Sequence, residues 1–403
     1  ATSTSNALAR SPNNDFVKTA NYFLMSGPVL DAALPTLSTF DVIVIPVEAQ
    51  IYNGSFFKTI REKNPNIIIL AYVATVSWND RYWGDELHQK LLRGIQTDWW
   101  LTDATGAQKS VWPGTRALNL NSGWTPYLAS FVKTEIMSTG LWDGIFYDEV
   151  QDSISWLSDV DVNRDRQNDS VSEADQLWRQ KYSELFSNTR QRLGNDAIIV
   201  INGSSNNALT GSINGRMFES FPSNDSALSA WEQNVRDYLS LQERIVKDPL
   251  LIVNVNTGNT GDRTNYQRVR FGLGTTLLGD GYFSFDFGTE NHAQTWVYDE
   301  YDAFLGQPKS VAKNVFDAAQ TIVKAGVWTR DFEQGKVIVN ASSSQQMVTL
   351  QGEYEKLRGA EDRSINNGAI ISRVSLKERD AVILLRPIEE ITDTAFQNGS
   401  FAR

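Results

Sequence analysis

The sequence predicts an α/β fold, namely a (β/α)8 TIM barrel followed by a small antiparallel β-sandwich domain. Three observations lead to this prediction. Eight short segments are strongly apolar, helical patterns separate most of them, and after about residue 308 the pattern changes to short alternating strands. The chain has 403 residues, more than one compact domain usually holds, so a large domain with a smaller companion is expected.

The eight apolar segments are near-continuous runs, and several are rich in Ile and Val. Such runs are typical of parallel strands that are buried on both faces. The predicted strands are NYFLMS (21–26), DVIVIPVEA (41–49), NIIILAYVA (66–74), DGIFYDEV (143–150), AIIVING (197–203), GRMFESF (215–221), LLIVNVN (250–256) and GYFSFDFG (281–288).

Helical patterns lie between these strands, as a barrel built from βα units requires. An open doubly wound sheet is the alternative arrangement. It is weakened because no glycine-rich phosphate loop follows the first strand. The predicted helices cover residues 55–65, 84–95, 124–140, 173–194, 226–246 and 264–279.

The C-terminal part has a different pattern. VWTRDFEQGKVIVNASSSQQMVTLQGEYEKL and GAIISRVSLKERDAVILLR contain short alternating strands with turn residues between them, which is typical of an antiparallel β-domain. We therefore expect an N-terminal tail over residues 1–19, a catalytic barrel over 20–310 and the β-sandwich domain over 311–403.

Composition excludes several classes of protein. The net charge of −11 argues against a nucleic-acid partner, because such proteins carry a basic footprint. The chain has no cysteine, which excludes disulfides and thiolate sites, and its only histidines are His88 and His292, too few for a histidine-rich metal site. No apolar run approaches the roughly 20 residues of a membrane span, and the first residues lack the apolar core of a signal peptide.

Polar side chains close most of the predicted barrel strands. In parallel barrels, function gathers at the carboxyl ends of the strands, so these residues are expected to converge on one face. The strand-end residues, with the segment that follows the third strand, are Glu48, Tyr72, Trp78, Asp80, Asp148, Glu149, Asn202, Glu219, Asn254, Asn256 and Asp286.

Carboxylates at several strand ends favour glycoside hydrolysis. That reaction needs one acid to protonate the leaving oxygen and a second to attack the anomeric carbon or activate water. Without cysteine or abundant histidine, carboxylates are the main acid/base groups available. Amides such as Asn202 and Asn254 suit sugar hydroxyls, because they both donate and accept hydrogen bonds. Aromatic rings could stack on sugars, although each one alone is more typical of core. Among the tryptophans between the third and fourth strands, those considered for stacking are Trp78, Trp99, Trp100, Trp112 and Trp142.

Asp148 and Glu149 are adjacent at the end of the fourth strand. Successive side chains of a strand point to opposite faces, so one of the two should enter the cleft and the other should turn toward the helices or a loop. We expect Asp148 to enter the cleft.

An acidic loop follows this strand and predicts a structural calcium site. Asp161, Asn163, Asp165 and Asp169 stand at offsets 1, 3, 5 and 9, which are oxygen-ligand offsets of an EF-hand loop. Arg166 occupies the position of the loop's glycine, so a non-EF calcium loop is expected, with a solvated acidic loop as the alternative. No organic cofactor is expected.

Several segments together resemble hypothetical glycosyl hydrolase families with a barrel catalytic domain, similar in pattern to endo-polygalactosaminidase-like barrels. They are NPNIIILAYV, RALNLNSGWTPYLASFV, LWDGIFYDEV, the acidic loop, AIIVINGS and GDGYFSFDFG, and VWTRDFEQGKVIVNAS resembles the R-x-F-x-x-G-x-V-x-V-N segment of the β-domain that follows such barrels. The resemblance covers roughly residues 20–388 and implies a sugar-cleaving enzyme with Asp148 and Glu219 as the acidic pair.

The leading hypothesis is therefore a secreted or cell-surface glycoside hydrolase that cleaves a polysaccharide or oligosaccharide. Asp148 would be the nucleophile or transition-state carboxylate and Glu219 the general acid/base. A non-catalytic carbohydrate-binding or structural surface protein on the same scaffold is the alternative. A polysaccharide deacetylase or lyase is the third, although deacetylase chemistry normally uses a histidine-rich metal site.

Overall fold

The computed structural model describes residues 17–387 except 26, 223–226 and 246. Most of the predicted tail over residues 1–19 lies outside the described residues. The chain divides into two compact units, of which the first contains residues 18–265 and 279–297 and the second residues 17, 266–278 and 298–387. The expected linear division at residue 310 stays a prediction.

The first unit is built around an eight-stranded parallel sheet, as the eight apolar segments predict. The sheet nearly closes into a barrel, because a parallel bridge joins Thr19 to Phe283 and places the first strand beside the last. In sheet order the strands are β1 (Ala20–Tyr22), β2 (Val42–Pro46), β3 (Ile68–Ala74), β6 (Gly144–Val150), β7 (Ile198–Gly203), β8 (Gly215–Glu219), β9 (Ile252–Asn256) and β10 (Tyr282–Asp286).

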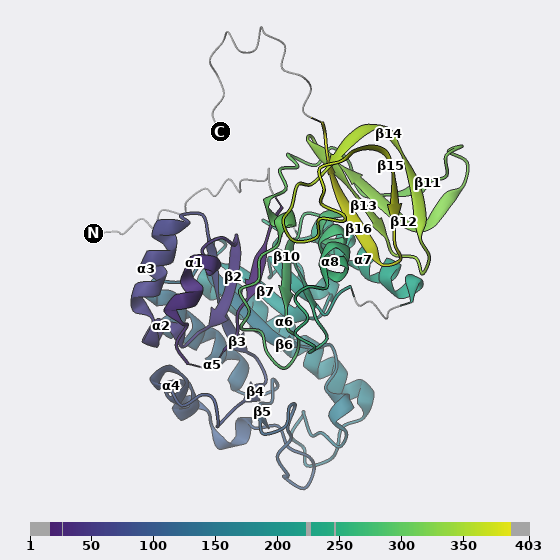
Figure 1. Ribbon diagram of the computed structural model, residues 1–403. Coiled ribbons are helices and arrows are strands. Elements are labelled where there is room, and N and C mark those ends of the chain that lie inside the picture. Colours follow the sequence, from purple (N-terminus) through teal and green to yellow (C-terminus); the bar gives the residue numbers. More distant parts are fainter. Residues whose placement is uncertain (1–16, 26, 223–226, 246, 388–403) are drawn as a thin grey trace. The chain divides into compact units, whose positions relative to one another are not determined.

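Helices connect most of these strands and lie outside the barrel in Figure 1. The connection from β7 to β8 carries a short 3-10 turn, η6 (Asn207–Leu209), in place of an α-helix. A two-stranded ribbon, β4 (Ser77–Trp78) and β5 (Arg116–Ala117), extends the region after β3. The helices of this unit are α1 (Leu34–Leu37), α2 (Ala49–Tyr52), α3 (Gly54–Lys63), α4 (Glu86–Gly94), α5 (Trp124–Phe131), α6 (Val171–Leu193) and α7 (Leu228–Arg244).

Strand alternation decides which side chains enter the barrel. Phe146 of β6, Val200 of β7 and Met217 of β8 lie in one fully buried apolar cluster in the barrel interior. The next interior position along each strand lies two residues further, at the carboxyl end. Those three positions hold polar residues, Asp148, Asn202 and Glu219.

Regular pairing breaks at the end of β6. The register with β7 shifts between Tyr147 and Val150, and Glu149 has a φ of 67°. A left-handed backbone is uncommon for a residue other than glycine and marks a bulge that redirects the side chain.

The second unit contains a six-stranded antiparallel sheet, which confirms the predicted β-domain. Helix α8 (Tyr266–Leu277), which precedes β10 in the chain, packs on one face of this sheet against β13 and β16. Alternate side chains form a separate core on the other face, among them Ile338 and Val382. In sheet order the strands are β11 (Lys313–Phe316), β12 (Val323–Asp331), β13 (Gly335–Asn340), β16 (Asp380–Leu385), β14 (Gln346–Lys356) and β15 (Ile370–Leu376).

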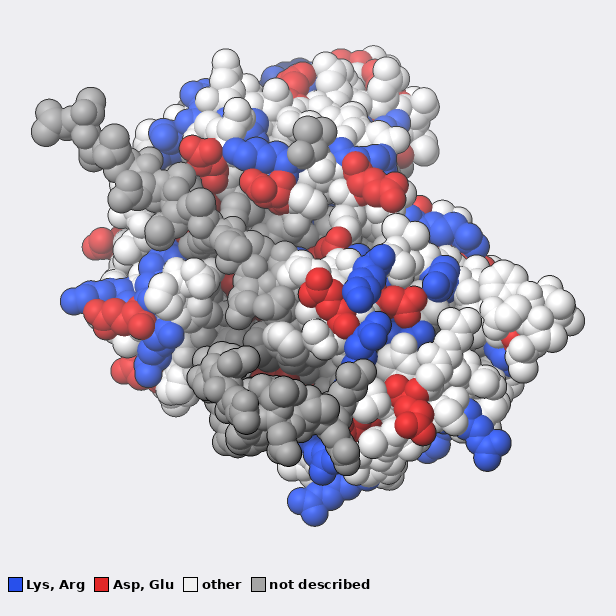
Figure 2. Space-filling model, turned by 90° about the horizontal axis from the view of Figure 1, so that it is seen from above, with Lys and Arg blue, Asp and Glu red and all other residues white. Residues whose placement is uncertain are grey.

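Helices of the described residues are all too short or too polar to cross a membrane. On the face seen in Figure 2, acidic and basic side chains are interspersed.

Candidate active site

A cleft of about 850 Å³ lies at the carboxyl ends of the barrel strands. The polar residues that line it come from six different segments, because each strand contributes the side chain at its end. Six of them, each from a different segment, are Glu48, Tyr72, Asp148, Asn202, Glu219 and His292.

Asp148 points into this cleft and is held by three hydrogen bonds. The hydroxyl of Tyr72 donates to its Oδ2 at 2.6 Å, and the amide of Asn202 donates to its Oδ1 at 3.0 Å. The backbone N–H of Glu149 also donates to Oδ1, at 2.7 Å. The orientation of this carboxylate is therefore fixed before any substrate arrives.

Glu219 stands at the end of β8, two strands further around the barrel. Burial raises the pKa of its carboxyl group, and the charge of Asp148 adds to the increase, whereas the hydrogen bond from Asn202 and the nearby His292 oppose it. A raised pKa favours the protonated form of the carboxyl group, which is the form that a general acid needs.

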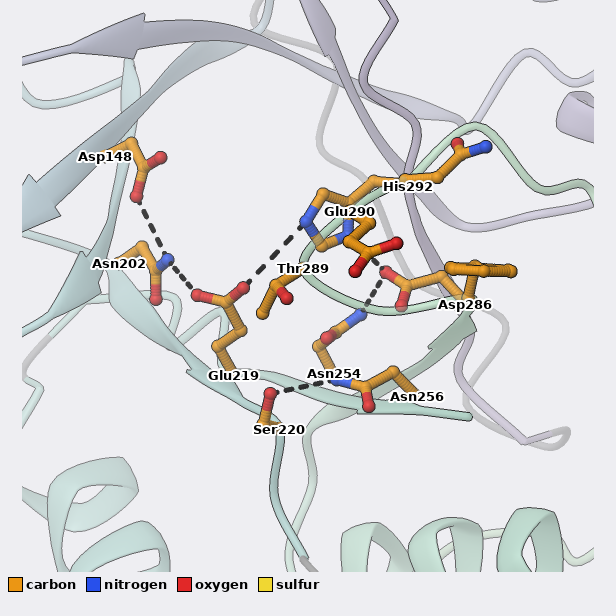
Figure 3. Close-up of polar contacts among 12 residues, drawn as sticks. Asp148, Asn202, Glu219, Ser220, Asn254, Asn256, Asp286, Thr289, Glu290 and His292 are labelled. Carbon is orange, nitrogen blue, oxygen red and sulfur yellow. Dashed lines mark hydrogen bonds and ion pairs between the residues drawn. The ribbon is translucent and has the colours of Figure 1, made fainter. Parts of the chain in front are cut away.

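Asn202 joins the two acids (Figure 3). Its Nδ2 atom donates to Oδ1 of Asp148 at 3.0 Å and to Oε2 of Glu219 at 2.8 Å. Since both oxygens lie within 3.0 Å of one nitrogen, they are at most about 6 Å apart. For this pair of oxygens, the limit is compatible with the carboxyl separation of retaining glycosidases, about 5–5.5 Å, and lies below that of inverting enzymes, about 6.5–9.5 Å.

His292 completes the wall of the cleft beside Glu219. Its Nδ1 lies 2.7 Å from Oδ2 of Asp286, and its Nε2 lies 4.0 Å from Oε1 of Glu219. Burial alone would lower the pKa of His292, but the hydrogen bond to Asp286 and the surrounding carboxylates raise it overall. Asn254 donates to the same Asp286 oxygen at 3.0 Å, so Asp286 is a buried support behind the imidazole.

Glu149 also lines the cleft, but it faces the loops after β3. Its Oε2 accepts from the backbone N–H of Ser77 at 2.9 Å, and its Oε1 accepts from the Ser77 hydroxyl at 2.6 Å and from the indole N–H of Trp112 at 2.7 Å. Burial raises the pKa of Glu149 to about 7, and the charge of Asp148 contributes. The left-handed backbone at Glu149 explains how both neighbouring acids reach one cleft despite strand alternation.

The remaining predicted residues occupy two kinds of position. Glu48 lines the cleft and is buried, which raises the pKa of its carboxyl group. Trp78 is fully buried and donates to Asp80 at 2.8 Å, while Asp80 pairs with Arg116 at the surface. The predicted binding residues that do not line the cleft are Trp78, Asp80, Asn254 and Asp286.

The acidic loop folds around its own backbone. Both carboxylate oxygens of Asp161 accept N–H groups, from Asp165 at 3.1 Å and Arg166 at 2.9 Å. Asp169 accepts from Val162 at 2.6 Å, and Asn163 accepts from Asp165 at 2.9 Å. Among the described residues, no group of three or more His, Cys, Asp or Glu residues is arranged to hold a metal. Calcium binding here stays a prediction, which calorimetry at millimolar calcium would test.

Several residues of the cleft were not predicted as site residues, among them Tyr22, Arg216 and His292. Tyr22 is the last residue of β1, whereas the predicted first strand continues to residue 26, and its ring packs edge-on against His292 with centroids 4.7 Å apart. The position of His292 shortly after the eighth strand was a signal, because a histidine is rare in this chain. Arg216 belongs to the apolar segment of β8, and only its side-chain contact with the cleft identifies it.

The model of hypothetical glycosyl hydrolase family 15 matches residues 61–336. No curated protein sequence matches the chain.

Several solved structures share this fold. Amy13B of Eubacterium rectale has a TM-score of 0.55 at 11% identity, covering 93% of this chain and 96% of its own. The maltogenic alpha-amylase AmyB of Thermotoga neapolitana has a TM-score of 0.54 at 10% identity, covering 94% and 100%. A GH31 family sulfoquinovosidase of E. rectale has a TM-score of 0.54 at 12% identity, covering 94% of this chain and 62% of its own. At these identities the likeness concerns the fold.

Proposed function

The chain belongs to hypothetical glycosyl hydrolase family 15 and is a glycoside hydrolase, and on this premise we propose that it cleaves a polysaccharide by a retaining mechanism. Asp148 acts as the nucleophile and Glu219 as the general acid/base. The observation that carries the proposal is the pair of hydrogen bonds from Asn202 Nδ2, which keep one oxygen of Asp148 within about 6 Å of one oxygen of Glu219 in the cleft.

In the first step an Asp148 oxygen attacks the anomeric carbon of the sugar. The bond from that carbon to the glycosidic oxygen breaks, and the leaving oxygen takes the proton of Glu219. In the second step the Glu219 carboxylate removes a proton from water. The water oxygen then attacks the anomeric carbon and releases Asp148, so that one water molecule is consumed and the configuration is retained.

Glu149 is another acid of the cleft, and burial raises its pKa to about 7. Its two oxygens, however, accept hydrogen bonds from Ser77 and Trp112. These donors direct the Glu149 carboxylate toward the loops, whereas the bonds of Asp148 and Glu219 converge on Asn202. The geometry therefore supports Glu219 rather than Glu149 as the proton donor.

A polymeric substrate is supported by the size of the cleft. Its volume of about 850 Å³ lies toward the upper end of the ~300–1,000 Å³ typical of small-molecule sites, and it is open to solvent. A polysaccharide is too large to cross a membrane unaided, so we place the enzyme outside the cell or on its surface.

Hydrolysis of a polysaccharide panel tests the proposal. The purified protein is incubated with soluble starch, xylan, mannan, chitosan, pectin and hyaluronan, and new reducing ends are measured. Asp148→Asn and Glu219→Gln should each lower the rate on the cleaved polymer at least ~10³-fold, because covalent catalysis and proton transfer are lost. The matched control is Glu290→Gln, which removes an exposed carboxylate near the site.

A glycosyl fluoride of the same sugar separates the two roles. Fluoride leaves without protonation, so Glu219→Gln should retain formation of the glycosyl-enzyme, whereas Asp148→Asn should not. Proton NMR of the first product should show the anomeric configuration of the substrate. Inverted product would refute Asp148 as a nucleophile, and full activity of Asp148→Asn would refute the site itself.

A further inference from the structure

We propose that Trp112 and Tyr82 form an aromatic platform for sugar rings beside the cleavage point, and that Glu149 positions the Trp112 ring. The inference rests on the proposed function and adds a binding site to it. Both rings line the same cleft as Asp148 and Glu219. Trp112 is 54% exposed and Tyr82 is 51% exposed, so both rings are accessible to a ligand, although the guanidinium of Arg81 lies over one face of Tyr82, 5.4 Å from the ring centroid.

The orientation of Trp112 is fixed although its ring is exposed. Its indole N–H donates to Oε1 of Glu149 at 2.7 Å, and the same carboxylate is held by the hydroxyl and backbone N–H of Ser77. Glu149 is adjacent in sequence to the proposed nucleophile Asp148, which ties the position of the ring to the catalytic centre.

The segment that carries Trp112 is also braced. Thr115 makes two hydrogen bonds with the backbone of Trp112. Its hydroxyl accepts from the backbone N–H of Trp112 at 3.1 Å, and its own backbone N–H donates to the Trp112 carbonyl at 3.0 Å. The next residue, Arg116, pairs with Trp78 across the ribbon of β4 and β5 and makes two hydrogen bonds to Asp80, at 2.9 and 2.8 Å. The platform is therefore built before the ligand binds, which lowers the entropy cost of binding.

The chemistry of the platform suits a carbohydrate chain. A pyranose ring presents C–H groups on its faces, and a flat aromatic ring buries them while the hydroxyl groups stay in water. Asp148 and Glu219 act on the sugar unit at the cleavage point. A sugar ring that stacks on Trp112 therefore belongs to another unit of the carbohydrate. The occupant is accordingly an oligosaccharide of at least two units.

Kinetics on long and short substrates test this inference. On the polysaccharide that the wild-type enzyme cleaves, Trp112→Ala should raise KM about tenfold and leave kcat within about threefold, because a stacking contact of this size is worth one decade in affinity. On the corresponding monosaccharyl fluoride, KM should stay unchanged. The matched control is Phe316→Ala, which removes an exposed ring of the second unit.

The role of Glu149 has its own readout. Glu149→Ala should raise KM on the polymer as Trp112→Ala does, and the double variant should add little, because both changes release the same ring. Glu149→Gln keeps an acceptor for the indole and should restore KM. A structural role alone would instead give additive effects and no rescue.

A binding assay with the inactive Asp148→Asn variant separates a failure of the aromatic platform from a failure of the hydrolytic mechanism. In gels cast with each polymer of the panel, Asp148→Asn should be retarded by one of them, and Asp148→Asn/Trp112→Ala should run freely. Retardation that depends on Trp112, without cleavage by the wild type, would refute the hydrolytic mechanism and support the platform. Equal mobility of the two variants in every gel, or an unchanged KM in Trp112→Ala, would overturn the platform.

Discussion

The hydroxyl group of Tyr72 donates a 2.6 Å hydrogen bond to Oδ2 of Asp148. Burial, followed by the charge of Asp148, raises the pKa of Tyr72 well above its usual range, so the phenol keeps its proton and remains a donor. The two residues lie on adjacent strands, where Tyr72 pairs with Phe146 and Asp148 with Ala74. The bond aims the proposed nucleophile across the cleft.

Removal of this donor should impair catalysis more than folding. Tyr72→Phe keeps the ring, and we expect kcat/KM to fall by about 10²-fold, because one preorganised hydrogen bond to the reacting carboxylate is lost. Steady-state kinetics on the cleaved polymer measure this. Tyr147→Phe is the control, since it removes a buried hydroxyl that contacts Thr189 outside the cleft. An equal loss of activity in both variants would assign the effect to stability.

Glu149 should make the fold less stable as the pH rises. Its pKa is about 7 in the folded protein and ordinarily 4.5, so the folded state binds more protons between these values. The associated stability is fully present below about pH 4.5 and is lost as the pH rises through about 7, by about 3 kcal/mol. In Glu149→Gln this loss should vanish. Urea unfolding between pH 5 and 8 measures the difference, and parallel pH profiles for the two proteins would contradict the assignment.

His292 should lower the pKa of Glu219 through its charge. The imidazole lies 4.0 Å from the Glu219 carboxylate, and its own pKa is raised by Asp286 and the other acids. In His292→Gln the alkaline limb of kcat/KM, which reports the general acid, should move to higher pH by up to about one unit. The pH–rate profile tests this, with His88→Gln as the control. A limb that moves to lower pH would exclude Glu219 as the group that titrates.

The second unit should depend on a buried ion pair. Arg270 donates to both oxygens of Asp380, at 3.0 and 3.2 Å, and also contacts Asp362 at 2.5 Å. Asp380→Ala leaves the guanidinium without its buried partner and should destabilise this unit by about 3 kcal/mol. Urea unfolding checks this value. Glu232→Gln, which breaks the more exposed pair with Arg236, should cost less than about 1 kcal/mol.

Acidic polysaccharides should be poor substrates. Four carboxyl groups line the cleft, from Glu48, Asp148, Glu149 and Glu219, and the charge of the whole chain is −11. A polymer of uronic acids would meet repulsion at the cleft and during its approach. Hydrolysis of pectin and hyaluronan should therefore be slower than that of neutral polymers at low salt, and a preference for them would contradict this reading.

The apolar pattern of the sequence was enough to predict the strands of the barrel. All eight barrel strands begin and end within a few residues of their predicted apolar segments. A strand that is buried on both faces is a nearly continuous apolar run, so the polar residues on either side of it mark its ends. The place of α8 was not predictable. Its pattern is that of an ordinary barrel helix, but its buried face includes Gly274, which lies against Ala381 and Val339 of the other sheet.

The sequence by itself determined that Asp148, Asn202 and Glu219 close three barrel strands, because alternation and parallel pairing follow from local pattern. Only the tertiary structure decided that one amide bridges the two acids, that His292 faces Glu219, and that Trp78 is core while Trp112 faces the cleft. Those relations depend on loop paths and on the left-handed backbone at Glu149, which are set by contacts between residues distant in the chain. Residue types and their spacing along the chain do not specify such contacts.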